Sequence, residues 1–355
     1  MPEPLLQVSD LRVHFVTDDG VVRAVDGVSY SVARGRTLGI VGESGSGKSV
    51  SSLTVMGLTR HSNAEISGAI SFEGRDLLNA TEPELRSIRG NEIAMIFQDP
   101  LSSLHPFYKV GWQLVEEIRT HHPDISNGAA RTRAIELLDM VEIPEARERV
   151  DAYPHQFSGG MRQRAMIAMA LANDPKLLIA DEPTTALDVT VQAQILDLIR
   201  RLQRELDTAV VMITHDLGVI AETADEIAVM YAGRIVERAS TETIFNAPEH
   251  PYTWGLLGSI PRLDAGRGAE LVPIPGRPPS LINLPSGCHF HPRCPYVRER
   301  HRQIDPSLEP VDGDRGHEVA CLLSPSTRRR IWSELREGRQ PAEARRSVEL
   351  EEKPA

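Results

Sequence analysis

The residue types best suited to phosphate chemistry lie in one segment, Gly42-Glu43-Ser44-Gly45-Ser46-Gly47-Lys48-Ser49. It matches the pattern GxxxxGK[ST], in which glycines allow the backbone to wrap a phosphate and to point several N–H groups at it. Lys48 would reach the outer phosphates of a nucleotide, and the Ser49 hydroxyl would bind Mg²⁺. An apolar run, 37–42, precedes the segment and a helical pattern follows it, which is the context that a nucleotide site requires.

Two adjacent carboxylates, Asp181 and Glu182, follow a second apolar run, 177–180. A buried strand with this sequence would deliver both carboxylates to its C-terminal end, beside the phosphate-binding segment. Asp181 would then hold Mg²⁺ through water, and Glu182 would orient or deprotonate the attacking water. Taken alone, an apolar run that ends in Asp-Glu is an ordinary strand end. Together with the phosphate-binding segment, it predicts hydrolysis of a nucleoside triphosphate.

A third segment, Phe157-Ser158-Gly159-Gly160-Met161, lies between the other two along the chain. Ser-Gly-Gly at the start of a helix is a second anion-binding helix N-terminus. The segment resembles the signature motif of ABC ATPases, usually written LSGGQ, and departs from it at both ends. With the order of the three motifs, the resemblance to this family covers residues 5–245.

The resemblance to ABC ATPases implies roles for further residues. Phe15 would stack on adenine, and Gln98 matches the Q-loop glutamine that touches Mg²⁺ or water. Ala186-Leu187-Asp188 matches the D-loop, and His215 matches the H-loop histidine that grips the γ-phosphate. Without the resemblance, Phe15 reads equally well as a core aromatic residue, and Gln98 and His215 read as polar residues that end strands.

The family holds ATP between two cassettes, so the resemblance implies that this chain works against a second copy of the same fold. One cassette would bind ATP and Mg²⁺ through Lys48, Ser49, Asp181, Gln98 and His215. The partner would cover the nucleotide with the signature residues Ser158, Gly159 and Gly160. Preorganised donors around the γ-phosphate are most effective in such a water-excluded site. Hydrolysis would separate the cassettes, a motion that the family transmits to membrane subunits.

Apolar runs alternate with helical patterns along most of the chain, which predicts a mainly parallel sheet with helices on both faces. Hairpins are expected at Asp18-Asp19-Gly20 and at Ala232-Gly233. The fold class is α/β. The resemblance implies the P-loop NTPase fold of ABC ATPases, with a parallel-sheet core, an antiparallel N-terminal part and a helical subdomain. We expect the nucleotide-binding domain to span 1–247, with the helical subdomain at about 99–165.

The composition changes after about residue 248, where prolines become too frequent for a continued α/β layer. We expect a small proline-rich domain at 248–337 and a charged, disordered tail at 338–355. Residues 250–253 and 274–296 resemble the C-terminal extension of dipeptide and oligopeptide permease ATPases, which nickel importers of the same subfamily also carry. This resemblance implies two transmembrane permease subunits, an extracytoplasmic substrate-binding protein, and a second ATPase that is identical or homologous.

All three cysteines, Cys288, Cys294 and Cys321, lie in this last region. Some members of the subfamily bind an iron–sulfur cluster through four cysteines, and His301 stands at the remaining ligand position here. Thiolates suit iron or zinc, and imidazole can replace one thiolate in either kind of site. The spacing is not the usual CxxC pattern of zinc sites. A 4Fe–4S cluster, a zinc ion and the absence of any metal all remain open.

The 39 Lys and Arg residues are outnumbered by 50 Asp and Glu, and the net charge of −11 argues against nucleic-acid binding. The chain shows no run of about 18 apolar residues and no secretion signal. We therefore expect a peripheral protein on the cytoplasmic face of the membrane that powers peptide import. The alternatives are a nickel or glutathione system, an exporter, a non-hydrolysing partner cassette and an ABC ATPase outside transport. Motifs alone do not fix the cargo.

Overall fold

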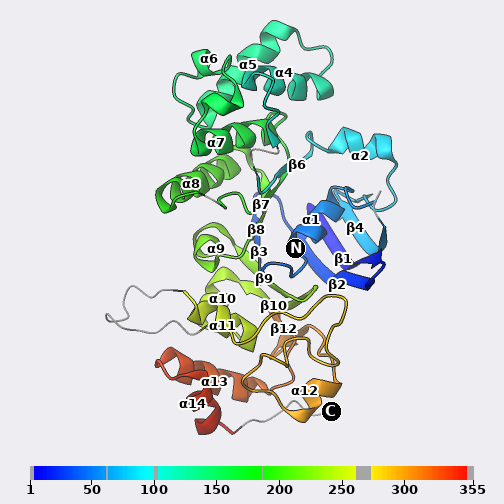
Figure 1. Ribbon diagram of the computed structural model, residues 1–355, viewed down its shortest axis with the longest axis vertical. Helices are drawn as coiled ribbons and strands as arrows, with labels where there is room; N and C mark the ends of the chain where they lie inside the picture. The colour runs from blue at the N-terminus through cyan, green and yellow to red at the C-terminus, as the bar shows by residue number, and fades with distance from the viewer. Residues whose placement is uncertain (1–3, 61–62, 100–102, 186, 261–272, 350–355) are drawn as a thin grey trace.

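An eight-stranded sheet forms the centre of the molecule (Figure 1). The structure is a computed structural model, and it describes residues 4–60, 63–99, 103–185, 187–260 and 273–349. The strand order is β11-β12-β10-β9-β3-β8-β7-β6. These strands are β3 (Thr37–Val41), β6 (Ile93–Ile96), β7 (Leu177–Asp181), β8 (Ala209–Thr214), β9 (Glu226–Tyr231), β10 (Arg234–Ser240), β11 (Glu309–Val311) and β12 (Asp314–Val319).

Five neighbouring strands, β9, β3, β8, β7 and β6, are parallel and almost wholly buried. Their sequences are short apolar runs, as a sheet covered on both faces requires, so the predicted parallel core is confirmed. The register pairs Val41 with Thr214, Asp181 with Ile213, and Ile96 with Ala180. The loops that follow β3, β6, β7 and β8 therefore leave the same edge of the sheet, where parallel sheets bind ligands.

The C-terminal region adds two strands to this sheet, so the sheet continues beyond residue 248, where prolines become frequent. β12 pairs antiparallel with β10, with Glu237 opposite Val319 and Arg238 opposite Glu318, and β11 pairs with β12. The prolines that suggested a break precede β12, whose own six residues contain none. Antiparallel pairing covers the edge of β10, whose backbone groups would otherwise be exposed.

The segment 338–355, expected to be a disordered tail, instead contains a helix, α14, at 341–347. Pro341 begins this helix, and Gln340 and Glu343 form a capping box at its start. Ala344 and Val348 are buried in the C-terminal core, an apolar contact that composition did not reveal. The helices after β8 are α9 (Leu217–Thr223), α10 (Thr241–Asn246), α11 (Pro251–Gly258), α12 (Glu299–Gln303), α13 (Pro325–Arg336) and α14 (Pro341–Ser347).

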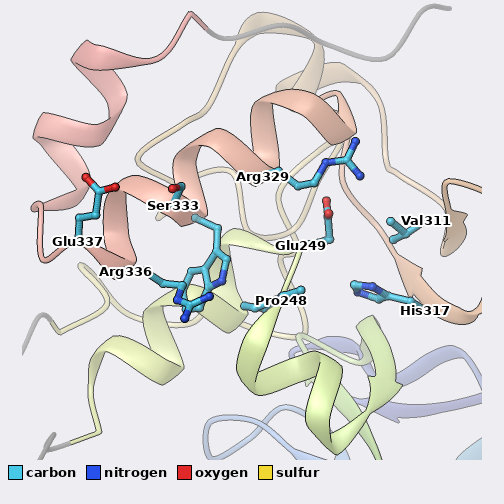
Figure 2. Close-up of a pocket in the computed structure, with 10 residues that line it drawn as sticks. Pro248, Glu249, Val311, His317, Arg329, Ser333, Arg336 and Glu337 are labelled. Atoms are coloured by element: carbon cyan, nitrogen blue, oxygen red, sulfur yellow. The ribbon is translucent and has the colours of Figure 1, made fainter. Parts of the chain in front are cut away.

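Figure 2 shows a cavity of about 630 Å³ between α13 and the segment after α10, with Glu249, His317 and Arg329 in its lining. Buried polar contacts lie at this junction. Nε2 of His317 is 2.9 Å from Oε1 of Glu237, and Arg328 pairs with Glu249. None of the predicted phosphate-binding residues lines this cavity, so it is not the expected nucleotide site.

A smaller antiparallel sheet is formed by the N-terminal part of the chain, as expected. Its strand order is β2-β1-β4-β5, and β1 and β2 are joined by the predicted hairpin, with Thr17 paired to Gly20. The helix α1 packs against β1 and β2 and connects this sheet to the central one. The elements are β1 (Leu6–Thr17), β2 (Gly20–Val32), α1 (Lys48–Val55), β4 (Ala64–Phe72), β5 (Arg75–Asp76) and α2 (Glu82–Ile88).

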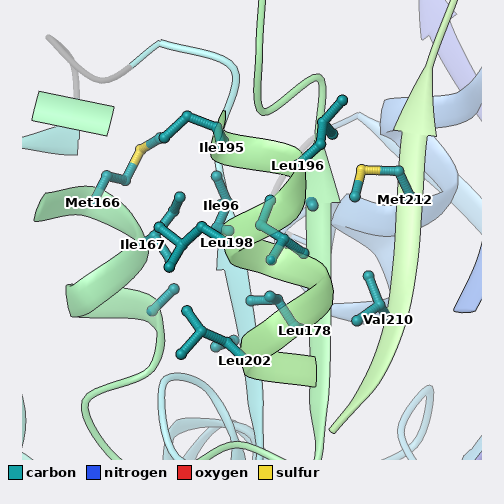
Figure 3. Packing of buried hydrophobic residues seen from close by; sticks show 14 of the residues in the cluster. Ile96, Met166, Ile167, Leu178, Ile195, Leu196, Leu198, Leu202, Val210 and Met212 are labelled. Carbon is teal, nitrogen blue, oxygen red and sulfur yellow. The ribbon is translucent and has the colours of Figure 1, made fainter. Parts of the chain in front are cut away.

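Two helices, α7 (Gly159–Ala170) and α8 (Val189–Leu206), cover the parallel strands with apolar side chains (Figure 3). The packed residues include Met166, Ile167, Ile195, Leu198 and Leu202 from the helices and Ile96, Leu178, Val210 and Met212 from the strands. The helices α4 (Val110–His121), α5 (Asn127–Met140) and α6 (Ala146–Arg149) lie beyond α7 at one end of the molecule (Figure 1). Among the described residues, no helix combines the length and apolar character needed to cross a membrane.

Candidate active site

The phosphate-binding segment forms the loop between β3 and α1, at the edge where the parallel strands end. Gly47 caps α1 with a left-handed backbone, φ +101°, and a Cβ there would lie 2.0 Å from the carbonyl oxygen of Ala24. Only glycine fits this close approach. The backbone N–H of Gly233, in the β9–β10 turn, donates to the carbonyl of Ser46 at 3.0 Å. Ser44 and Gly45 are exposed at the tip of the loop.

The ammonium group of Lys48 is held by its own loop. Its Nζ donates to the carbonyl oxygens of Gly42 at 2.7 Å and Glu43 at 3.0 Å, and the residue is 5% exposed. Burial lowers the pKa of Lys48, while the charges of Glu182 and Asp181 act in the opposite direction. The lysine is thus preorganised at the loop, where the motif expects phosphates.

Ser49 and Asp181 are brought together by α1 and β7, which are far apart in sequence. The Ser49 hydroxyl donates to Oδ1 of Asp181 at 3.0 Å. Burial, with the neighbouring charge of Glu182, raises the pKa of Asp181 above its usual value. A hydroxyl and a carboxylate are hard oxygen ligands of the kind that Mg²⁺ prefers, so the pair fits the predicted ion.

Three side chains converge on Glu182, the residue after β7. Its Oε2 accepts hydrogen bonds from Nε2 of Gln98 at 3.1 Å and from the Thr185 hydroxyl at 2.9 Å. Nδ1 of His215 lies 3.3 Å from Oε1. Gln98 and His215 follow β6 and β8, the strands on either side of β7, which explains why the three meet. Thr185 was missed by the sequence analysis, although its position three residues after Glu182 allows a local hydrogen bond.

The signature residues lie at the start of α7. The Ser158 hydroxyl accepts a hydrogen bond from the Met161 backbone N–H at 3.2 Å, so it caps its own helix. Ser158 and Gly159 are exposed and Gly160 is half-buried. Phe157 is 3% exposed and packs in the core, where leucine stands in the motif. None of the hydrogen bonds described for 158–160 reaches the phosphate-binding loop.

Two family models match the sequence. The family described as ABC transporter matches residues 25–185, and the family described as oligopeptide/dipeptide transporter, C-terminal region, matches residues 236–300. The chain is 54% identical over 301 residues to the oligopeptide transport ATP-binding protein OppD of Salmonella typhimurium. That alignment covers 84% of this chain and 89% of the relative. The chain belongs to the ABC transporter ATPase family.

Further relatives of this ABC ATPase carry similar names. OppD of Haemophilus influenzae is 54% identical, with 90% of this chain and 98% of the relative aligned. The dipeptide transport ATP-binding protein DppD of Bacillus subtilis is 53% identical, with 90% and 95% aligned. The predicted likeness to the peptide permease subfamily is therefore confirmed.

Solved structures confirm the ABC ATPase fold. A dimeric, post-hydrolysis state of the ATP-binding cassette MJ0796, bound to ADP and Pi, superposes with a TM-score of 0.60 at 27% identity. The match covers 66% of this chain and 98% of that cassette. The cassette cbiO1 from Clostridium perfringens gives a TM-score of 0.57 at 26% identity, over 69% and 92% of the two chains.

Two further residues of the ABC pattern have less defined surroundings. Phe15 is half-buried in β1 and packs against the N-terminal core, so its role against adenine remains a prediction. Oδ1 of Asp188 accepts a hydrogen bond from the Val191 N–H at 3.0 Å and caps α8. Ala186, the first residue of the matched D-loop, lies outside the described residues.

The expected metal site of the ABC ATPase is not supported. Cys288 and Cys321 are buried, Cys294 is half-buried, and the Cys288 N–H donates to the carbonyl of His301 at 2.9 Å. Burial, together with the neighbouring Cys321, raises the pKa of the Cys288 thiol to about 12. Across the described part of the chain, no three His, Cys, Asp or Glu side chains are grouped to hold a metal ion.

Proposed function

We propose that this ABC ATPase hydrolyses ATP to drive the import of oligopeptides or dipeptides, as one of two cassettes docked on membrane permease subunits. The observation that carries the proposal is the convergence on Glu182 of Gln98, Thr185 and His215, beside Lys48 and the Ser49–Asp181 pair. A complete set of this kind supports a hydrolysing cassette over a regulatory one. The names of the relatives support peptides as the cargo over nickel or glutathione.

The chemistry assigned to these residues is attack of water on the γ-phosphorus of ATP. Glu182 accepts the proton of that water as the bond between the γ-phosphorus and the bridging oxygen breaks. Gln98 and Thr185 orient the Glu182 carboxylate, and His215 lies on its other oxygen. Mg²⁺, held through Ser49 and Asp181, would neutralise negative charge on the phosphates.

We propose further that the signature residues of a second cassette complete the nucleotide-binding site. The second cassette is either an identical chain or a homologous one. The exposed Ser158 and Gly159 support this arrangement, because a helix N-terminus attracts a phosphate brought to it by a partner. A dimeric cassette is also among the similar solved structures. The assembly would include two permease subunits and an extracytoplasmic substrate-binding protein, and would place this chain at the cytoplasmic face. A metal at the cysteines is not part of the proposal.

The test is to purify the tagged chain from gently solubilised native membranes, identify its companions by mass spectrometry and assay ATP hydrolysis. We expect two multi-spanning permeases, with a binding protein that retains peptides and stimulates hydrolysis in the assembled complex. Recovery of ribosomes, of DNA, or of the chain alone would refute the transport proposal. A binding protein that retains nickel or glutathione instead would refute the peptide assignment.

A further inference from the structure

The C-terminal region contacts the phosphate-binding loop at Glu43, which has no role in the proposed chemistry. Every polar group of this residue is engaged. Its backbone N–H donates to the Tyr252 hydroxyl at 2.9 Å, and its carbonyl accepts from Nζ of Lys48 at 3.0 Å. Its carboxylate binds the guanidinium of Arg293 through both oxygens, at 2.5 and 2.9 Å. Glu43 thus links the phosphate-binding lysine to two residues of the C-terminal region.

Arg293 is fixed in orientation by its other contacts. Its Nε donates to the carbonyl of Pro275 at 2.8 Å, and its guanidinium lies 5.7 Å from the ring centre of Tyr231. The residue is 6% exposed. Although burial acts against the charge, the hydrogen bonds that Arg293 donates to Glu43 and Tyr231 raise the pKa of Arg293 above its usual value. A bidentate arginine–carboxylate pair of this kind is directional as well as strong.

Tyr252 is equally constrained. It lies in α11, is fully buried, and packs with two other aromatic rings, Tyr231 at 4.7 Å and Phe290 at 5.4 Å between ring centres. Its hydroxyl therefore cannot move away from the Glu43 N–H without disturbing this cluster. A rigid aromatic cluster and a buried guanidinium hold the same loop residue from one side.

We propose that Arg293 and Tyr252 are positioning residues for nucleotide binding, through which the C-terminal region sets the affinity of the cassette for ATP. The proposal rests on the ATP site described above. Loop residues that must be ordered on binding lower the affinity, so a loop already held at Glu43 binds more tightly. The Glu43 carbonyl transmits this constraint to Lys48, because it accepts a hydrogen bond from Nζ of Lys48. Neither residue needs to touch the nucleotide.

The experiment measures Mg-ATP binding by the full-length chain, and KM and kcat of the assembled complex. The variants are Arg293→Met, Arg293→Lys and Tyr252→Phe, with the exposed Arg302→Met as matched control. We expect Arg293→Met to raise the Kd and KM for ATP on the order of tenfold, the scale of a lost charge-assisted hydrogen bond, with a smaller change in kcat. Arg293→Lys keeps the charge without the bidentate geometry, so its Kd and KM for ATP should lie between those of the wild type and Arg293→Met. Tyr252→Phe should weaken binding less, and Arg302→Met not at all.

A double variant separates an effect of Arg293 through Glu43 from a general effect on the stability of the fold. If Arg293 acts through Glu43, then Arg293→Met should weaken ATP binding much less in a Glu43→Gln background than in the wild type. Wild-type affinity in both Arg293→Met and Tyr252→Phe would overturn the inference. If Arg293→Met does not fold, Tyr252→Phe alone decides. A wild-type complex that binds Mg-ATP without hydrolysing it would instead refute the proposed function and leave the affinity comparison valid.

Discussion

Glu182 combines an unusual backbone with a crowded side chain. Its φ of +48° lies in the left-handed region, and its carboxylate accepts from Gln98 and Thr185. Non-glycine residues in this conformation are costly and are retained where the surroundings hold them, often at functional sites. The left-handed backbone of Glu182 therefore occurs where neighbouring side chains also hold its carboxylate.

Replacing Glu182 with glutamine tests its role as the base. Glutamine keeps the size and one acceptor oxygen but cannot take the proton, so we expect ATP turnover of the complex to fall by about 10²–10⁴-fold. Binding of Mg-ATP should persist. Turnover is measured as phosphate release, with the exposed Glu205→Gln as control. Undiminished turnover in Glu182→Gln would show that another group takes the proton.

We expect the ionised Asp181 carboxylate to lower the stability of the fold while it binds Mg²⁺. Burial raises the pKa of Asp181, so the native protein disfavours its ionised form relative to the unfolded chain. The stability of the wild type therefore falls as the pH rises from the ordinary pKa of 3.8 through the raised pKa of the native state. We expect the neutral Asp181→Asn to melt at a higher temperature than the wild type at pH 7.5 without nucleotide. The gain should shrink as the pH falls, and Mg-ATP should no longer stabilise the variant. Lower thermal stability of Asp181→Asn at pH 7.5 would mean that the ionised form stabilises the fold.

Motifs single out the individual residues of the candidate ATP site, whereas the contacts between them come from the fold. Lys48, Ser49 and Asp181 are each implied by local sequence. The meeting of Gln98 and His215 at the Glu182 carboxylate depends on strand order, which no local pattern contains. No sequence motif predicts the contact between Glu43 and Arg293. The cysteines near Arg293 suggested metal binding instead.

At the scale of single elements, α11 depends on a neutral histidine. Nδ1 of His250 accepts from the Tyr252 N–H at 3.0 Å and caps the helix, and the ring is fully buried. Burial, and then the charge of Arg328, lowers the pKa of His250 to about 3, and His301 also lies close enough to oppose its protonation. Since the unfolded chain binds a proton near pH 6.5, the stability that His250 contributes is present above that pH and is lost as the pH falls toward 3.

The variant His250→Asn keeps a side-chain cap but cannot be protonated. We expect the free energy of unfolding of this variant to depend less on pH between about 6.5 and 4, with a slope smaller by about 1.4 kcal/mol per pH unit. Urea denaturation at several pH values measures the slope, and the exposed His155→Asn serves as control. An unchanged slope in His250→Asn would show that another group causes the loss of stability in acid.

Periodicity predicted the parallel strands well because each is a short apolar run between turn signals. It failed for β12, whose residues Asp314–Val319 are mostly polar and read as a loop. What makes this segment a strand is the open edge of β10 and the buried Glu237, which lies 2.9 Å from His317. Tertiary pairing of this kind is absent from any local window.

On the scale of the whole molecule, the C-terminal region completes the central sheet. A chain that stops after residue 308 would lose β11, β12 and the His317 partner of Glu237, leaving β10 as an open edge. We expect this truncation to lower Tm by on the order of 5 °C and to promote aggregation. Size-exclusion chromatography and thermal denaturation measure both effects, and a chain that stops after residue 349 is the control. A monomeric product of the shorter chain with unchanged Tm would contradict this view of the sheet.

The pairing of Glu43 with Arg293 joins residues that are 250 positions apart. During synthesis, the phosphate-binding loop leaves the ribosome long before its distant partner exists. Contacts of such long range form slowly, and a growing chain that lacks them exposes incomplete surfaces. If Arg293 sets the affinity for ATP as proposed, a nascent cassette would reach its full affinity only after residue 293 has left the ribosome and folded against the loop.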